Sequence, residues 1–333
     1  MKSSAFPPRP VITVFLFSLW LANSPGPLPA AESQHVLVAQ QKSGTEVTLM
    51  GVHFHDTRLG WAVGDGGAIL KTVDGGKRWK KVPSGTSARL TGVFFVDSRR
   101  GWVVGANGTI RHSKDGGESW APQSSGVQVP LYGLYFVSPT HGWVVGGSGT
   151  ILYTEDGGIH WSDQISGTNA ALYAVHFVDS RRGTAVGALG TILSTADGGA
   201  TWIAQEAPSS VTFFDVFFND SSNGWAVGNA GAMFQTSDAG NRWIDRTLPC
   251  TKSCTRVTDL IRIRFTSPQA GWIVGERGSV FRTTDAGFTW VEEKNDAKVS
   301  LFGLSFPDPF HGWASGERGT IVHIAAPLEP VKR

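Results

Sequence analysis

Residues 101–120 read GWVVGANGTIRHSKDGGESW, and versions of this stretch recur along most of the chain. The opening glycine recurs seven times, at successive intervals of 41, 41, 41, 41, 47 and 41 residues. The seven pairs are Gly60-Trp61, Gly101-Trp102, Gly142-Trp143, Gly183-Thr184, Gly224-Trp225, Gly271-Trp272 and Gly312-Trp313. Periods of about 40 to 50 residues with several short strands per unit are typical of propeller blades. The spacing therefore predicts an all-β fold, a seven-bladed β-propeller.

The second repeat divides into four antiparallel strands. Leu90 to Val96 alternates apolar and other residues, Gly101 to Gly105 is a short apolar run, Thr109 to Ser113 follows, and Trp120 opens the last strand. Stretches rich in Asp, Asn and Gly separate the four segments and mark turns. Each repeat is therefore predicted to form one four-stranded antiparallel blade.

The aromatic residues follow the same repeat. Twelve of the 13 Trp occupy two repeat positions, and Trp20 lies in the N-terminal apolar run. A Phe stands six residues before every repeat Gly, as Phe54, Phe95, Phe136, Phe177, Phe218, Phe265 and Phe306. Equivalent rings in every unit are expected to fill the space between sheets. No tryptophan is left for a separate ligand platform.

A second recurrent element is an Asp-Gly-Gly or Asp-Ala-Gly turn, five residues before a Trp. Its carboxylates belong to Asp74, Asp115, Asp156, Asp197, Asp238 and Asp285. Such a carboxylate accepts hydrogen bonds from backbone N–H groups a few residues on, and Gly tolerates positive φ. Calcium ligands or catalytic acids are the alternative interpretation. Six copies at matching positions favour structural turns.

The seventh unit ends after Ile324 without an Asp turn or a closing Trp. Its missing strand is predicted at the other end of the chain, because Lys42-Ser43-Gly44 lies 41 residues before Pro83-Ser84-Gly85. An N-terminal strand within His35 to Gln41 would complete blade seven and remove the exposed edges of an open array. The predicted propeller spans residues 35–325, followed by a C-terminal tail at 326–333.

Residues 1–31 are predicted to be a signal peptide. Lys2 and Arg9 precede the apolar run from Val11 to Ala22, and a Pro- and Ala-rich stretch follows. Twelve residues are short for a membrane span, although a retained membrane anchor is the alternative. Cleavage would remove two basic residues and no acid, so the net charge of +2 would fall to about zero. We therefore expect an exported monomer without a membrane span, located in the periplasm, and no nucleic-acid partner.

The two cysteines, Cys250 and Cys254, lie in the insertion that lengthens one repeat to 47 residues. In an exported protein a disulfide across this small loop is the preferred interpretation. A metal site is the weaker alternative, because two thiolates need further ligands and no His cluster is adjacent. The sequence predicts no metal and no cofactor.

The combination of Gly-Trp-x-Val-Gly, Gly-x-Ile, Thr-x-Asp-Gly-Gly and Trp, repeated after an export signal, resembles the photosystem II stability and assembly factor family. The resemblance covers about residues 35–325. It implies a seven-bladed propeller of the periplasm or thylakoid lumen that binds newly made membrane subunits and does no covalent chemistry. The turn motif itself also occurs in sialidases and sortilin-type receptors, so by itself it indicates fold rather than function.

Candidate binding residues are the arginines at which the repeats differ. On the face that carries the Asp turns, four of them precede the repeat Gly of blades two and four: Arg99, Arg100, Arg181 and Arg182. On the opposite face, Arg277 and Arg318 stand in adjacent blades six and seven. Arg262 and Arg264 lie on the strand of blade six nearest the central channel. Arginine at such sites binds carboxylates or phosphates in bidentate fashion; the alternative is a solvated turn residue or one paired with a neighbouring Glu.

The expected function is a non-enzymatic binding scaffold that assists assembly or stability of a membrane-associated protein complex. A carbohydrate- or surface-ligand-binding propeller is the alternative. A sialidase-like glycosidase is a third class, and it requires a tyrosine nucleophile, a carboxylate and an arginine cluster. The four tyrosines all share repeat positions with other residues, so none stands out as a nucleophile.

Overall fold

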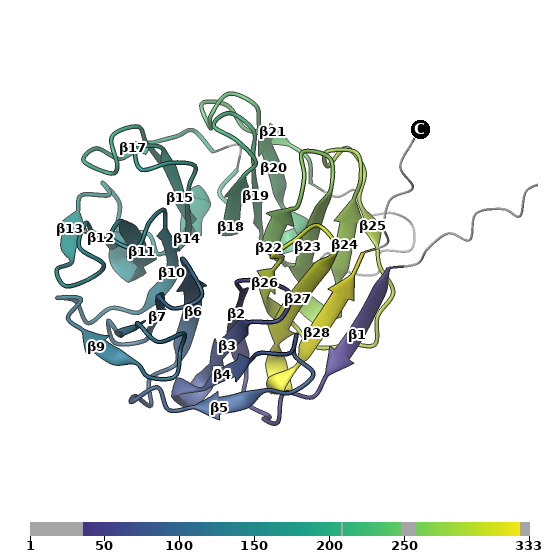
Figure 1. The fold of residues 1–333 in the computed structure, drawn as a ribbon. Helices are drawn as coiled ribbons and strands as arrows, with labels where there is room; N and C mark the ends of the chain where they lie inside the picture. Colours follow the sequence, from purple (N-terminus) through teal and green to yellow (C-terminus); the bar gives the residue numbers. More distant parts are fainter. Residues whose placement is uncertain (1–35, 208, 248–257, 327–333) are drawn as a thin grey trace, which may run out of the picture. The chain divides into compact units, whose positions relative to one another are not determined.

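A computed structural model describes residues 36–207, 209–247 and 258–326. The predicted signal peptide, both cysteines and residues 327–333 lie outside these ranges. The described residues form seven four-stranded antiparallel sheets arranged as a ring (Figure 1). The predicted seven-bladed β-propeller is therefore confirmed.

The inner strand of each blade begins with an apolar residue and ends at Phe or Ser. These strands are β2 (Leu49–Phe54), β6 (Leu90–Phe95), β10 (Leu131–Phe136), β14 (Leu172–Phe177), β18 (Phe213–Phe218), β22 (Leu260–Phe265) and β26 (Leu301–Ser305). Each contacts the inner strand of the next blade, and β26 contacts β2. The contacts therefore run around the complete ring.

The second strand of each blade carries the Gly-Trp repeat or its Gly-Thr variant. These strands are β3 (Gly60–Gly64), β7 (Gly101–Gly105), β11 (Gly142–Gly146), β15 (Gly183–Gly187), β19 (Gly224–Gly228), β23 (Gly271–Gly275) and β27 (His311–Gly316). The first six are buried at every position. Neighbouring blades cover both faces of these strands, which explains their continuous apolar sequence.

The third strands are β4 (Ile69–Thr72), β8 (Ile110–Ser113), β12 (Ile151–Thr154), β16 (Ile192–Thr195), β20 (Met233–Thr236), β24 (Val280–Thr283) and β28 (Ile321–Ala325). The outer strands are β5 (Lys80–Val82), β9 (Ala121–Gln123), β13 (Ser162–Gln164), β17 (Ile203–Ala204), β21 (Ile244–Asp245), β25 (Val291–Glu292) and β1 (Leu37–Gln41). Short 3-10 turns join second to third strands at η1 (Asp65–Gly67), η2 (Gly147–Gly149), η3 (Ala188–Gly190), η4 (Asn229–Gly231), η5 (Glu276–Gly278) and η6 (Glu317–Gly319).

The two ends of the described chain share blade seven. β1 pairs antiparallel with β28, from Leu37 opposite Ala325 to Gln41 opposite Ile321. Gln41 also reaches blade one, where its Nε2 donates to the carbonyl of Gly75 at 2.9 Å. The predicted closure by an N-terminal strand is confirmed, and β1 covers the free edge of β28.

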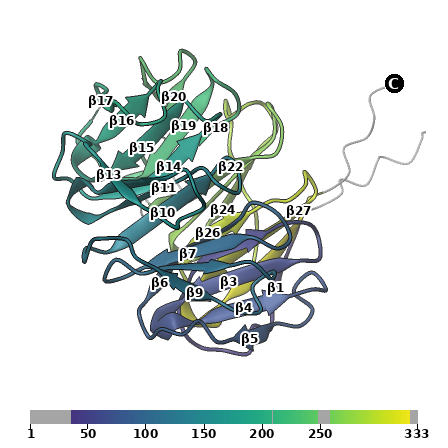
Figure 2. The same ribbon diagram turned by 60° about the vertical axis from the view of Figure 1, so that its left-hand side comes forward.

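Aromatic stacks join neighbouring blades. The Trp of one blade stacks on the Phe of the next at ring-centroid distances of 3.4 Å for Trp61 and Phe95 and 3.7 Å for Trp102 and Phe136. The repeat Gly makes room for this Phe, because a Cβ at Gly101 would lie 2.5 Å from the Phe95 ring. Figure 2 shows the blade of β6, β7 and β9 over that of β3, β4 and β5, consistent with the contact of β6 with β3.

The turns divide between two faces. On one face, the N–H of Gly116 in the Asp turn of blade two donates to the carbonyl of Arg99 in the turn between β6 and β7. On the other face, the N–H of Gly108 between β7 and β8 donates to the carbonyl of Val129, which precedes blade three. We call these the Asp-turn face and the linker face.

Candidate functional site

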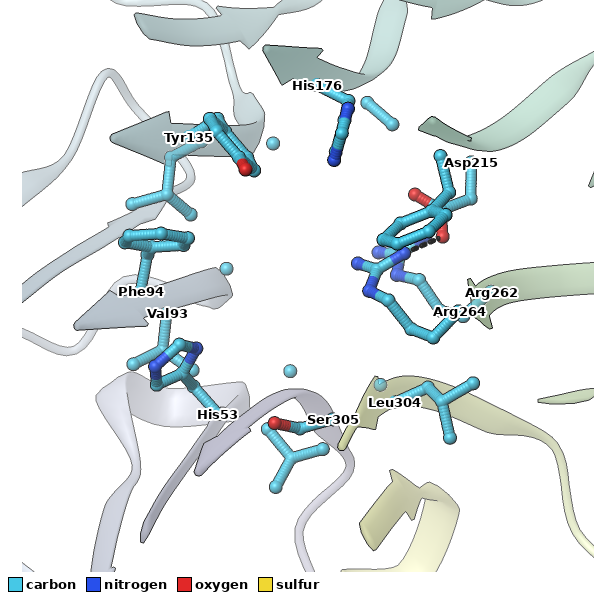
Figure 3. Close-up of a pocket in the computed structure, with 18 of the residues that line it drawn as sticks. His53, Val93, Phe94, Tyr135, His176, Asp215, Arg262, Arg264, Leu304 and Ser305 are labelled. Atoms are coloured by element: carbon cyan, nitrogen blue, oxygen red, sulfur yellow. Dashed lines mark hydrogen bonds and ion pairs between the residues drawn. The ribbon is translucent and has the colours of Figure 1, made fainter. Parts of the chain in front are cut away.

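The inner strands enclose a central channel with a cavity of ≈ 250 Å³ that all seven blades line. Side chains from opposite blades point into it (Figure 3). Seven of the lining residues occupy one repeat position, the register partner of the blade Trp or Thr184. They are His53, Phe94, Tyr135, His176, Phe217, Arg264 and Ser305.

Six of these seven side chains form a chain of ring contacts, which we call the channel belt. Ring centroids lie 5.1 Å apart for His53 and Phe94 and 5.4 Å for Phe94 and Tyr135. The chain continues at 4.8 Å to His176 and 5.0 Å to Phe217. The guanidinium of Arg264 ends it, 5.8 Å from the centre of the Phe217 ring. The belt is therefore mainly a wall of π surfaces.

The Arg264 side chain bonds to Asp215 of the preceding blade. Its guanidinium lies 2.6 Å from Asp215 Oδ2, which also accepts the backbone N–H of Ile263 at 3.0 Å. Asp215 is 3% exposed, and these two donors supply hydrogen bonds to a carboxylate that has little access to water. The pair consequently joins blade five to blade six as well as lining the channel.

Arg262 lies two residues before Arg264 on β22, on the same side of the strand. Its Nη1 donates to the carbonyls of Phe214 at 3.1 Å and Ile261 at 3.0 Å, and no carboxylate among the described residues forms an ion pair with it. Burial, and to a lesser extent the charge of Arg264, lower the pKa of Arg262. Since arginine stays protonated in proteins, two cations face one carboxylate in this part of the channel.

The channel histidines add no charge at neutral pH. Burial, with the nearby Arg264, lowers the pKa of His176 to about 3, and burial, followed by His55, lowers that of His53 to about 3. Burial also raises the pKa of Tyr135. All three rings are therefore neutral at physiological pH, and the excess positive charge belongs to the arginines.

Arg277 and Arg318 lie on the linker face, at the apex of η5 and η6. Both side chains are exposed, and their φ values are 56° and 53°. Neither forms an ion pair with a described residue, including the preceding Glu276 and Glu317. At the same apex position, the other blades carry uncharged residues: Gly66, Asn107, Ser148, Leu189 and Ala230. Two unpaired cations thus stand on adjacent blades.

The four arginines of the Asp-turn face divide into two kinds. Arg100 and Arg182 each bond to an aspartate of their own turn, at 2.6 Å from Asp97 and from Asp179 respectively. Arg99 and Arg181 are exposed and form no ion pair within the described residues. Each of these two turns therefore holds one paired and one unpaired arginine.

The recurrent aspartates hold their own turns. Asp74 Oδ1 accepts the N–H of Arg78 at 2.9 Å, and Asp156 Oδ1 accepts that of His160 at 2.9 Å. These backbone hydrogen bonds are the largest cause that lowers the pKa of each of the two carboxyls to about 2. Asp115, Asp197 and Asp285 accept equivalent N–H bonds from Ser119, Thr201 and Thr289, and Asp238 accepts that of Arg242.

The described residues contain no group of three His, Cys, Asp or Glu side chains placed to hold a metal ion. Cys250 and Cys254 lie outside the described residues. In the same described ranges, no helix is long and apolar enough to cross a membrane.

Sequence reasoning missed Asp215, the partner of Arg264. The equivalent residues are Gly51, Gly92, Gly133, Ala174, Arg262 and Gly303. Asp215 could have been singled out from the sequence, because four of the equivalent positions hold glycine and the repeat itself does not require a carboxylate there. The arginine two residues after Arg262 then supplies the opposite charge from the adjacent blade.

These features define a seven-bladed propeller with Asp turns and a partly cationic channel. The sequence matches the family model described as "Photosynthesis system II assembly factor YCF48" over residues 30–130 and 202–292, more than half of the chain. The chain belongs to this family. No curated protein matches the sequence.

Solved structures agree with the fold. A structure of YCF48 bound to D1 peptide has 20% identity and a TM-score of 0.72, covering 90% of this chain and 97% of that chain. YCF48 from Cyanidioschyzon merolae has 22% identity and a TM-score of 0.72, covering 86% and 98%. The GH74 xyloglucanase from Xanthomonas campestris has 14% identity and a TM-score of 0.70, covering 86% of this chain and 53% of the enzyme. At these identities the likeness concerns the fold alone, and an enzyme is among the proteins that share it.

Proposed function

We propose that this protein is an exported, non-enzymatic scaffold that binds a segment of a membrane-associated protein during assembly of its complex. Family membership supports this class of function. The observation that carries the binding site is that Arg277 and Arg318 are both unpaired and stand on adjacent blades. Arg100, Arg182 and Arg264 bond to aspartates, and the unpaired Arg99 and Arg181 lie on blades that are not adjacent.

The channel chemistry favours binding over catalysis. Of the described residues that line the cavity, Asp215 is the only carboxylate, and Arg264 and a backbone N–H already engage it. Glycoside hydrolysis ordinarily needs two carboxyl groups on opposite sides of the bond. The partly buried Tyr135 has a raised pKa, which disfavours the phenolate form of a nucleophile.

Exposed guanidinium groups suit a partner segment that carries carboxylates, because each can form two parallel hydrogen bonds to one carboxylate. Arg277 and Arg318 lie at the tips of turns, where a partner reaches them without opening the ring. A D1 peptide is the ligand of a solved YCF48. By analogy, we propose a membrane subunit or its assembly intermediate as the partner of this chain.

Charge reversal on one face tests the proposal. We expect Arg277→Glu with Arg318→Glu to reduce capture of the partner from detergent-solubilised membranes at least tenfold, measured by quantitative pulldown. The matched control is Arg99→Glu with Arg181→Glu, which makes the same charge change on the Asp-turn face. Equal capture by both double variants would refute docking through the linker face.

Arg264 is left unchanged in these variants because a glutamate there would face the buried Asp215 and destabilise the fold. Arg262→Met removes the channel cation that has no carboxylate partner, without adding a carboxylate, and tests whether the segment enters the channel. Hydrolysis of fluorogenic glycosides by the wild-type protein would contradict the non-enzymatic proposal, and saturable binding on a glycan array would favour the carbohydrate-binding alternative.

A further inference from the structure

The boundary between blades four and five lacks the stack that joins most other blades. Elsewhere the second-strand Trp covers the Phe of the next blade, but blade four carries Thr184 at this position. Its partner across the sheet is Ser194, also small. The equivalent pairs elsewhere are larger, such as Trp102 with His112 and Trp143 with Tyr153. Two adjacent bulky side chains are therefore missing from one boundary.

A cleft of ≈ 430 Å³ occupies this place on the Asp-turn face. Thr184, Ser194 and Gln205 of blade four line it on one side, and Phe218 and Ala239 of blade five line it on the other. This volume lies in the range of sites that bind small ligands or side chains. Thr184 does not supply the aromatic ring that stacks on the corresponding Phe at the other boundaries.

The hydrogen bond that a tryptophan at position 184 would donate is also absent. In blades one, two, three and seven the Trp Nε1 donates to a carbonyl in the Asp turn of the next blade, as Trp102 does to Gly157 at 3.1 Å and Trp143 to Gly198 at 3.1 Å. The equivalent carbonyl here is that of Ala239. No side chain in the described ranges donates to it.

The neighbouring glutamine does not replace the indole. Gln164 Nε2 donates to the Gly198 carbonyl at 3.0 Å, and its Oε1 accepts from Trp202 Nε1 at 3.0 Å. The equivalent Gln205 instead donates to Ser194 Oγ at 2.6 Å. Trp243, the counterpart of Trp202, is 6% exposed and its Nε1 has no partner. The equivalent Nε1 of Trp120 and Trp290 also lacks a partner, so the feature of this boundary that an added indole can satisfy is the open Ala239 carbonyl.

We propose that the cleft between blades four and five binds the indole side chain of a tryptophan presented by a bound polypeptide. The ring would cover Phe218, and its N–H would donate to the Ala239 carbonyl, as the indoles of Trp61, Trp102, Trp143 and Trp313 donate to the equivalent carbonyls at four other boundaries. Arg182 lies on the lining of the same cleft and bonds to Asp179, so one ion pair borders the gap. The cleft lies on the Asp-turn face, separate from Arg277 and Arg318.

N-acetyl-L-tryptophanamide is the probe, because it presents the indole with a peptide-like backbone. We expect saturable millimolar binding to the full-length protein by NMR titration, with shifts centred on Phe218 and Ala239. The 1-methylindole analogue of the probe, which lacks the N–H, should bind at least tenfold more weakly. Absence of saturation at about 10 mM, or equal affinity of the methylated analogue, would overturn the proposal. So would binding of free indole without binding of the amide.

Two substitutions at Thr184, one that fills the cleft and one that leaves it open, test the same proposal. Thr184→Trp should abolish probe binding because its own indole takes the site, whereas Thr184→Val leaves the cleft open and should retain the wild-type affinity within twofold. If Thr184→Trp does not fold, Phe218→Leu removes the stacking ring and should weaken binding at least tenfold. Unchanged binding to Phe218→Leu would contradict the assignment. These measurements use a small probe, so they are independent of whether Arg277 and Arg318 bind a partner.

Discussion

The buried imidazole of His176 makes stability depend on pH. Its native pKa is about 3, against an ordinary value of 6.5. Between these values the unfolded chain binds a proton that the native chain does not, so the free energy of unfolding falls as the pH decreases through 6.5. From pH 7 to pH 5 this one group should remove about 2 kcal/mol. We expect His176→Phe to lose less stability over that interval than the wild type, measured by urea denaturation.

Phenylalanine is a suitable replacement because Phe94 and Phe217 occupy the same position in other blades. The window from pH 7 to pH 5 separates the histidines from Asp74 and Asp156, whose lowered pKa values affect stability only below about pH 4. Ile165→Ala, at a side chain that is 87% exposed and not titratable, is the control and should keep the wild-type slope. If the free energy of unfolding of His176→Phe changes with pH as much as that of the wild type, His176 takes up its proton in the native state over this pH range.

The channel position of Arg264 could be predicted from the sequence, but its ion-pair partner could not. Repeat alignment places its side chain on the channel, because it shares a position with His53 and Phe94. It does not identify Asp215, which lies 49 residues earlier in another blade. The repeat spacing predicts the features that all blades share. It does not predict a bond between two residues that depart from the repeat, because such a bond depends on how far each side chain extends across a blade boundary.

At the scale of the element, β1 is the strand that closes the ring. Its five residues pair with β28, Val38 contacts the apolar cluster of blades six and seven, and Gln41 bonds to blade one. Deletion of residues 1–41 should expose the edge of β28 and lower the free energy of unfolding by about 3 to 5 kcal/mol. The exposed edge should also promote self-association. Chemical denaturation and light scattering measure the two effects.

Deletion of residues 1–34 is the matched control, because it leaves all of β1 in place. This shorter deletion should remain monomeric with wild-type stability. If the two deletions behave alike, β1 does not close the ring in solution. The strand was predictable because its flanking residues keep the 41-residue register. The open boundary beside β15 was not predicted, because the sequence shows Thr184 in place of Trp but does not show that Gln205 bonds to Ser194.

At the scale of the whole molecule, each apolar cluster joins two neighbouring blades. One cluster contains Trp61 of blade one with Phe95 of blade two, and another contains Trp102 with Phe136 of blade three. No blade therefore has a core of its own, and loss of one boundary weakens the neighbours on both sides. We expect the ring to unfold as a single cooperative unit, unlike an open array of repeats.

Phe136→Ala tests this expectation. It removes a 2% exposed ring that stacks on Trp102 at 3.7 Å, and core Phe→Ala substitutions cost about 3 to 5 kcal/mol. Native-state hydrogen exchange should report an equal loss of protection in blade three and in the distant blades six and seven. Ile165→Ala, at a side chain that is 87% exposed, should leave protection unchanged in every blade. Loss confined to blades two, three and four would mean that the ring opens locally, with each boundary contributing its stability separately.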